Sequence, residues 1–192
     1  MESAMYGEGA RELQDTFDSR RLADRLEQVT VHHYLSDGDR AFVERSTQFL
    51  LGTVDPDGWP DVSYKGGRPG FVRVLDPTTL AFPSYDGNGM FRSLGSILAD
   101  PKVSMLFIDY THPDRMRVQG RATVSDDPEV VASFEGAQLV VTVKIDRVWP
   151  NCPRYVHRMD LVELSPYAPA AGYEPPVPEW KEMDVFRDVL PG

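Results

Sequence analysis

The sequence predicts a mainly β protein of the α+β class, with six or seven short strands in a barrel or sandwich and short helices at its periphery. From residue 48 onwards, runs rich in β-branched and aromatic residues are separated by turns rich in Asp, Pro and Gly. Strand and helix signals do not alternate regularly along the chain. A parallel, doubly wound sheet is therefore not expected.

Length and composition predict the domain organisation. The chain has 192 residues, of which 41% are hydrophobic, so it can bury one core but is too short for two domains of typical size. We expect an N-terminal helical extension over residues 1–47 and a β domain over residues 48–164. A proline-rich C-terminal arm is expected over residues 165–192.

Two helices are predicted in the N-terminal extension. Apolar residues recur at helical spacing among charges over residues 11–28, which predicts one amphipathic helix that lies on another surface. Ser36 and Asp37 are good N-caps for a second, shorter helix. That helix would carry Phe42 and Val43 on one side.

The strand signals begin with a β-hairpin, in which a turn rich in Asp, Pro and Gly separates residues 48–54 from residues 60–64. Short helices are predicted within residues 87–101, which Asp100-Pro101 ends, and within residues 126–135, with Asp126 or Asp127 as the cap. The remaining predicted strands cover residues 71–75, 79–83, 102–109, 115–125 and 138–149.

The C-terminal arm is predicted to be extended, because residues 165–178 contain five prolines. Such an arm would lie across a neighbouring surface, and the alternative is a loosely ordered tail. From residue 179 a short helix could carry Trp180, Met183 and Phe186 on one face.

Charge and cysteine content exclude several classes of protein. A net charge of -10 argues against a general partner of nucleic acid or of anionic membranes, so an anionic ligand needs a local basic site. We find no signal-peptide pattern and no apolar run near the roughly 20 residues of a membrane helix. Cys152 is the only cysteine and no histidine has a partner at metal-ligand spacing, so we expect a cytoplasmic protein without a metal site.

Two segments together suggest a phosphate site. In residues 61–75, hydroxyl and cationic side chains are interleaved with glycines that let the backbone approach a ligand. Residues 82–94 add similar groups at the entrance to a helix, where free N–H groups and the dipole favour an anion. Either segment alone is more typical of an ordinary surface, and neither matches a nucleotide P-loop. The candidate residues are Ser63, Tyr64, Lys65 and Arg73 in the first segment and Ser84, Tyr85, Asn88, Arg92 and Ser93 in the second.

A second cluster lies in residues 143–159 and adds Asn151, Cys152 and Arg154 to the candidate binding residues. Trp149 and Tyr155 next to an arginine could pack on a planar heterocycle, or they could be core or interface residues. Cys152 lacks an oriented base with a third partner, which favours a structural or ligand-facing thiol over a nucleophile. No catalytic side chain is identified.

Four phrases occur in an order that resembles the FMN-binding split β-barrel proteins related to pyridoxamine 5'-phosphate oxidase. They are "FLLGTVDPDGWPDVSYKGG", "TLAFPSYDGNGMFRSLGSILADPKVSMLFI", "MRVQGRATV" and "WPNCPRYVHRM". The resemblance covers roughly residues 15–164 and is strongest to the bacterial FMN-dependent subgroup of that class. It implies a six- to seven-stranded antiparallel split β-barrel.

The resemblance also implies a homodimer with FMN at each of two sites in the subunit interface. Carried over by position, the phosphate-facing residues are Ser63, Ser84 and the pair Arg92-Ser93, while "NCPRY" would come from the other chain. Where the oxidases have an arginine in the first strand, this chain has Ser63, and Lys65 and Arg73 are candidates to replace that charge. The oxidases' C-terminal substrate motif is not recognisable, so vitamin B6 oxidation is not expected.

The function that the resemblance implies is an FMN-dependent oxidoreductase that exchanges hydride between a nicotinamide donor and a small organic substrate. Such a protein needs few reactive side chains, because the flavin carries the chemistry at its own ring. The alternatives are a flavin-binding, storage or sensing protein without dedicated turnover, and a deazaflavin-dependent reductase.

Overall fold

The computed structural model describes residues 5–190, so the first four residues of the predicted N-terminal extension and the last two of the arm lie outside the described residues. The helices are α1 (Glu8–Thr16), α2 (Arg20–Thr30), α3 (Asp37–Arg45), α4 (Arg92–Ala99), α5 (Pro128–Ala132) and the 3-10 helix η1 (Glu179–Glu182). The strands are β1 (Gln48–Val54), β2 (Pro60–Gly66), β3 (Arg73–Asp76), β4 (Thr79–Tyr85), β5 (Lys102–Asp109), β6 (Asp114–Ser125) and β7 (Ala137–Asn151). Each predicted strand agrees with an observed one to within two residues at either end.

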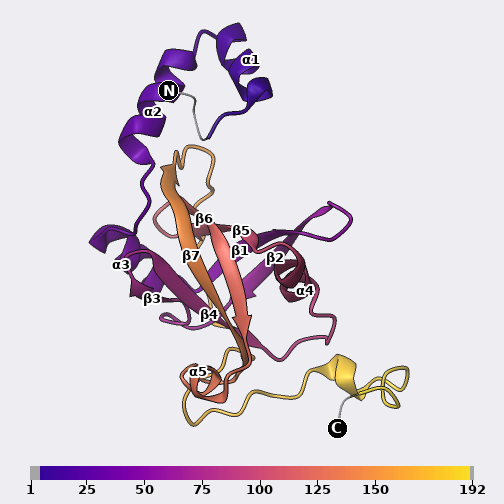
Figure 1. The fold of residues 1–192 in the computed structure, drawn as a ribbon. Coiled ribbons are helices and arrows are strands. Elements are labelled where there is room, and N and C mark those ends of the chain that lie inside the picture. The colour runs from indigo at the N-terminus through magenta and orange to yellow at the C-terminus, as the bar shows by residue number, and fades with distance from the viewer. Residues whose placement is uncertain (1–4, 191–192) are drawn as a thin grey trace.

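The strands form one antiparallel sheet in the order β2-β1-β5-β6-β7-β4-β3. The edge strands β2 and β3 are consecutive in sequence, and only residues 67–72 connect them. The seven Cα–Cα steps from Gly66 to Arg73 span at most about 25 Å, so the two edges must approach each other. The sheet therefore curls around its core (Figure 1), and the predicted antiparallel split β-barrel is confirmed.

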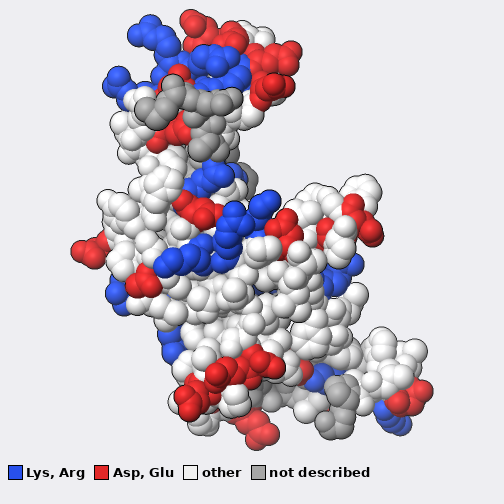
Figure 2. Space-filling model, in the orientation of Figure 1, with Lys and Arg blue, Asp and Glu red and all other residues white. Residues whose placement is uncertain are grey.

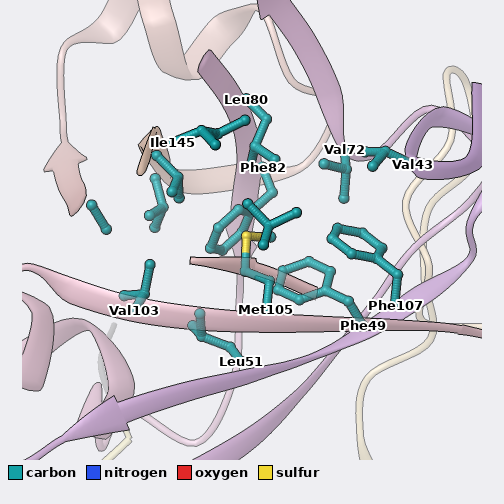
Figure 3. Packing of buried hydrophobic residues seen from close by; sticks show 14 of the residues in the cluster. Val43, Phe49, Leu51, Val72, Leu80, Phe82, Val103, Met105, Phe107 and Ile145 are labelled. Carbon is teal, nitrogen blue, oxygen red and sulfur yellow. The ribbon is translucent and has the colours of Figure 1, made fainter. Parts of the chain in front are cut away.

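Phe49 on β1 lies at the centre of the core (Figure 3). Its ring centroid is 4.9 Å from that of Phe82 on β4 and 5.2 Å from that of Phe107 on β5. The ring of Phe71, in the loop between the two sheet edges, stacks on Phe49 at 5.9 Å. Because these rings come from β1, β4, β5 and the connecting loop, their burial holds the curled sheet together.

Helix α3 begins where the sequence predicts it. The Ser36 hydroxyl accepts a hydrogen bond from the Asp39 N–H at 3.3 Å, and the Asp39 carboxylate accepts one from the Ser36 N–H at 3.0 Å. This capping box satisfies two backbone donors that the helix leaves open. Phe42 and Val43 are buried, as their predicted shared side requires.

The prediction of one helix over residues 11–28 is wrong, because α1 and α2 form a helical hairpin there. Asp18 adopts a left-handed conformation with φ 48°, which ends the helical path between them. Ion pairs Arg11–Asp24 and Arg20–Asp15 join the two helices. Neither helix has a buried residue, and the hairpin stands away from the barrel (Figure 1). The predicted packing on another surface is therefore not seen for this hairpin.

The arm after β7 is extended and lies against the barrel. Arg68, in the loop between β2 and β3, donates from Nε to the Ala168 carbonyl at 3.3 Å and lies 5.8 Å from the ring centroid of Tyr173. The short helix expected from residue 179 is the single 3-10 turn η1. Trp180 and Phe186 contact each other at 5.7 Å, whereas Met183 is exposed, so the three do not form one packed face.

The excess of acidic residues is unevenly distributed. Figure 2 shows a band of basic side chains across the middle of this face and a group of acidic ones near its lower end, while the upper end carries both kinds. A locally basic site is therefore compatible with a net charge of -10. Within residues 5–190, no helix combines the length and the apolar character that crossing a membrane requires.

Candidate cofactor cleft

A cleft of about 1350 Å³ opens at one end of the barrel, between β2, the loop that joins β4 to α4, the first turn of α4 and the C-terminal tail. We call it the cofactor cleft. Seven of the predicted binding residues meet there, together with acidic residues, a glutamine and tail residues that were not among the predicted ones. The predicted residues in its lining are Ser63, Lys65, Ser84, Tyr85, Asn88, Arg92 and Ser93.

Strand β2 supplies its residues to the cleft by simple alternation. Asp61, Ser63 and Lys65 line the cleft, while Val62 and Tyr64 are exposed on the opposite side. This is the period of two that a strand imposes on its side chains. The same alternation identifies Asp61 as a lining residue, a signal that was available in the sequence.

The end of β4 supplies two consecutive residues, Ser84 and Tyr85, to the same cleft. Regular alternation would place one of them on the other face, but the register with β7 shifts between these two residues. Burial raises the pKa of Tyr85 above 10.0, and the nearby charge of Arg73 opposes that rise. Tyr85 is therefore a neutral hydroxyl at physiological pH.

Helix α4 points its N-terminal end into the cleft. Its N-cap residue, Phe91, has a left-handed backbone with φ 47° and offers no side-chain hydrogen bond to the first N–H groups. Asn88 orders the preceding loop by accepting a hydrogen bond from the Met90 N–H at 3.1 Å. An uncapped helix start bordered by hydroxyls favours a negatively charged group.

Lys65 is the cation best placed to meet such a group. Its Nζ donates to the Ser93 Oγ at 2.9 Å, so the ammonium lies at the start of α4. Burial lowers the pKa of Lys65 below 10.5, and the charge of Asp61 opposes the shift. A partly buried ammonium that has lost some of its hydration gains more from an arriving anion than a fully exposed one does.

Arg92 adds a second, more exposed cation at the helix start. Its Nε lies 3.6 Å from the Asp61 Oδ2, and its side chain is 58% exposed. Three cationic and two carboxylate side chains line the cleft, which leaves it with a small positive excess in an acidic protein. They are Lys65, Arg92 and Lys181 against Asp61 and Asp86.

Another wall of the cleft is formed by the C-terminal tail, which sequence reasoning did not assign to the site. Its lining residues are Trp180, Lys181, Phe186, Val189 and Leu190. The tail residues other than Lys181, together with Met90 and Phe91, make part of the cleft apolar. The cleft thus combines an anion-binding end with an aromatic and aliphatic wall, a donor set that fits a phosphate joined to a planar ring.

The structure places five predicted residues outside the cofactor cleft. Tyr64 lines a smaller neighbouring cleft of about 300 Å³, which shares Tyr85 and Asp86 with the larger one. Arg73 instead lies 4.0 Å from the ring centroid of Phe134. β2 and β3 are the two edge strands of the sheet and do not pair with each other, and Arg73 does not line the cofactor cleft.

Asn151, Cys152 and Arg154 lie at and beyond the far end of β7. Ala137, at the start of that strand, pairs with Tyr85, whereas Asn151 pairs with Arg115. Fourteen residues of strand separate these points by about 45 Å along the chain. The Cys152 carbonyl accepts hydrogen bonds from Arg115, and Trp149 is buried, which favours a core role for this tryptophan. Within residues 5–190, no group of three metal-ligating side chains is present.

The sequence profile of pyridoxamine 5'-phosphate oxidase matches residues 35–153. Among solved structures, a candidate pyridoxamine 5'-phosphate oxidase from Lactobacillus delbrueckii is similar at 26% identity and a TM-score of 0.50, covering 62% of this chain and 95% of that one. HupZ of Group A Streptococcus has 13% identity and a TM-score of 0.50, covering 66% of this chain and 99% of that one. No protein of curated function matches. Since the family profile spans more than half of the sequence and the fold agrees, the chain belongs to the pyridoxamine 5'-phosphate oxidase family of split β-barrels.

Proposed function

We propose that the cofactor cleft binds FMN and that the protein is an FMN-dependent oxidoreductase acting between a nicotinamide donor and a small organic substrate. The observation that carries this proposal is the partly buried Lys65 ammonium beside Ser93 at the uncapped start of α4, in a cleft that also has apolar lining residues. Family membership and the sequence resemblance support flavin as the ligand.

The polar end of the cleft would hold the phosphate and the ribityl chain. Lys65 and Arg92 supply positive charge, and the α4 N–H groups supply donors aimed at an anion. The hydroxyls of Ser63, Ser84 and Ser93 can donate or accept. These residues fix the ligand by its charged end and leave its ring towards the apolar wall.

When bound, FMN supplies hydride acceptance and donation at its own ring. The protein's part is to bind, to orient and to exclude water. Met90 and Phe91 offer apolar surface for that purpose, and Tyr85 stays neutral next to it. No histidine lines the cleft within the described residues, so the reaction would depend on the positioning of the ring rather than on a histidine acid or base.

The proposal includes a homodimer in which the other chain closes the site. The sequence resemblance supports this arrangement, with Asn151, Cys152 and Arg154 approaching the partner's cleft. Exposed apolar side chains such as Val62 and Leu98, at 66% and 74% exposure, are suited to an interface. Sedimentation at micromolar concentration tests the homodimer. A monomer would contradict the role proposed for Asn151, Cys152 and Arg154.

The experiment that tests turnover uses protein loaded with FMN and measures the oxidation of NADH and NADPH with an artificial acceptor. The proposal predicts steady oxidation of at least one donor. Tight FMN binding without turnover for a broad panel of donors would instead indicate a storage or sensing protein. Displacement of FMN by a deazaflavin coenzyme in a competition titration would identify the coenzyme as the deazaflavin.

A further inference from the structure

The C-terminal tail, residues 179–190, lies outside the part of the chain that the family profile matches, yet it forms one wall of the cofactor cleft. The arm that leads to it is fixed on the barrel by Arg68 at Ala168 and Tyr173. Figure 1 shows this segment, in yellow, passing below α4. The tail is therefore delivered to the cleft by an anchored arm.

The tail is held to the cleft by the Lys181–Asp86 ion pair, which we call the latch. The Lys181 ammonium forms an ion pair and hydrogen bond with the Asp86 carboxylate, and the Gln138 Nε2 donates to the other oxygen of Asp86 at 3.2 Å. Lys181 has 25% of its side chain exposed, so most of it is covered. Asp86 begins the loop that carries Asn88 and leads to the start of α4. The latch thus connects the tail to the same loop that forms the anion-binding end.

The tail also presents aromatic surface to the cleft. Trp180 packs edge-to-face with Phe186 at 5.7 Å and an interplanar angle of 85°. The Lys181 Nζ lies 5.7 Å from the Trp180 ring centroid, so the latch and the aromatic pair form one unit. An indole oriented by two neighbours is a suitable platform for a planar heterocycle.

We propose that residues 179–190 are a strap that retains the cofactor, with Trp180 packing against its ring and the Lys181–Asp86 ion pair holding the strap closed. This inference rests on the proposed function and assigns a different part of the ligand to each wall of the cleft. The strap acts on the ring, whereas Lys65 acts on the phosphate. Loss of the strap therefore weakens riboflavin and FMN equally, while loss of Lys65 weakens FMN alone.

The test measures the rate of FMN dissociation and the affinities for FMN and riboflavin. Trp180→Leu should speed dissociation about tenfold, and Lys181→Met about threefold to fivefold, as for a partly exposed ion pair. Both variants should lose the same factor in affinity for riboflavin as for FMN. Combining Lys181→Asp with Asp86→Lys should restore slow dissociation, because the ion pair is re-formed with its charges exchanged.

Matched controls come from the same chain. Trp59→Leu changes a tryptophan that is 72% exposed in the β1–β2 turn, and Arg187→Met removes a tail cation that pairs with Asp184 and is 72% exposed. Neither residue lines the cleft, and both variants should match the wild type. Thermal unfolding of every variant shows whether it is folded.

The outcomes separate this inference from the proposed function. If the wild type takes up neither flavin, the proposed function is overturned and the strap with it. If the wild type binds FMN and the folded Trp180→Leu and Lys181→Met variants release it at the wild-type rate, only the strap is overturned. Equal effects of Lys181→Met and Arg187→Met would likewise overturn the latch, because general charge rather than the ion pair would explain them.

Discussion

Cationic side chains lie near both ends of β7, but their environments differ. At the Ala137 end, Lys65 is partly buried beside the start of α4, with a hydroxyl as its hydrogen-bond partner. At the Asn151 end, Arg115 donates to the Cys152 carbonyl in an exposed setting, and Arg154 is exposed. Burial and a nearby helix start make a cation a binding group, whereas an exposed cation is already satisfied by water and backbone.

The largest effect should come from removing Lys65, the partly buried cation of the cleft. Lys65→Met should weaken FMN binding by about 2–3 kcal/mol, or roughly 30-fold to 150-fold, because a charge-assisted contact in a desolvated site is lost. Titration calorimetry measures it, with Lys102→Met as the control, since Lys102 is 70% exposed and outside the cleft. Equal FMN affinity of the two variants would contradict the placement of the phosphate.

The second prediction concerns pH. The folded-state pKa of Lys65 lies below 10.5, so the ammonium loses its proton before an ordinary lysine does. FMN affinity should fall as the pH rises through that pKa, and Lys65→Met should lack this step. Tyr85 does not interfere, because its pKa is raised above 10.0. Fluorescence titrations from neutral pH to about pH 10 measure it; identical profiles for wild type and variant would refute it.

The lowered pKa of Lys65 also affects the stability of the ligand-free protein, and there the trend with pH is opposite to that of FMN affinity. Between the folded pKa of Lys65 and 10.5, the unfolded chain binds more protons than the folded one. The Lys65 contribution to the free energy of unfolding therefore rises with pH in that window. Urea denaturation of wild type and Lys65→Met measures the difference between the two slopes. A contribution that falls with pH would mean that Lys65 has a closer negative partner than Asp61.

Arg92 should have a smaller effect than Lys65. Arg92→Ala should weaken FMN binding by about 1.5 kcal/mol, near tenfold, because the side chain is 58% exposed and already lies 3.6 Å from Asp61. Arg121→Ala is a matched control, since Arg121 is 57% exposed and lies 3.8 Å from Asp146. If titrations find the same FMN affinity for Arg92→Ala and Arg121→Ala, the position of Arg92 in the cleft does not contribute to FMN binding.

The smallest effect on FMN affinity should come from Arg154, which lies beyond the Asn151 end of β7. Arg154→Ala should lower FMN affinity by about 0.5–1 kcal/mol, on the scale of an exposed charge contact, and only where sedimentation shows a dimer. The physical reason is that this residue reaches a cleft only through the partner chain in the proposed homodimer. An Arg154 effect in monomeric protein would contradict the separation of the two ends.

The strands could be predicted closely because their signal is local. Alternation and turn residues determine where β1 and β5 begin and end, and the Ser36 capping box does the same for α3. The single N-terminal helix failed because one residue, Asp18, leaves the helical region without breaking the apolar periodicity. Sequence periodicity does not contain that information.

The site was predicted only in part, because its assembly is not local. Ser63 and Lys65 follow from alternation on β2, and Arg92 and Ser93 from the start of α4. Arg73 was expected in the site, but its guanidinium lies over the Phe134 ring and does not line the cleft. Trp180 and Lys181 reach the cleft through an arm of irregular structure, and neither composition nor spacing indicates where such an arm ends.

The visible absorption spectrum of freshly purified protein, followed by titration with FMN, tests the central claim most directly. We predict a yellow protein, or a colourless one that takes up one FMN per chain with a perturbed flavin spectrum and much weaker uptake in Lys65→Met. A folded, colourless protein that takes up no FMN would contradict the claim that this cleft is a flavin site.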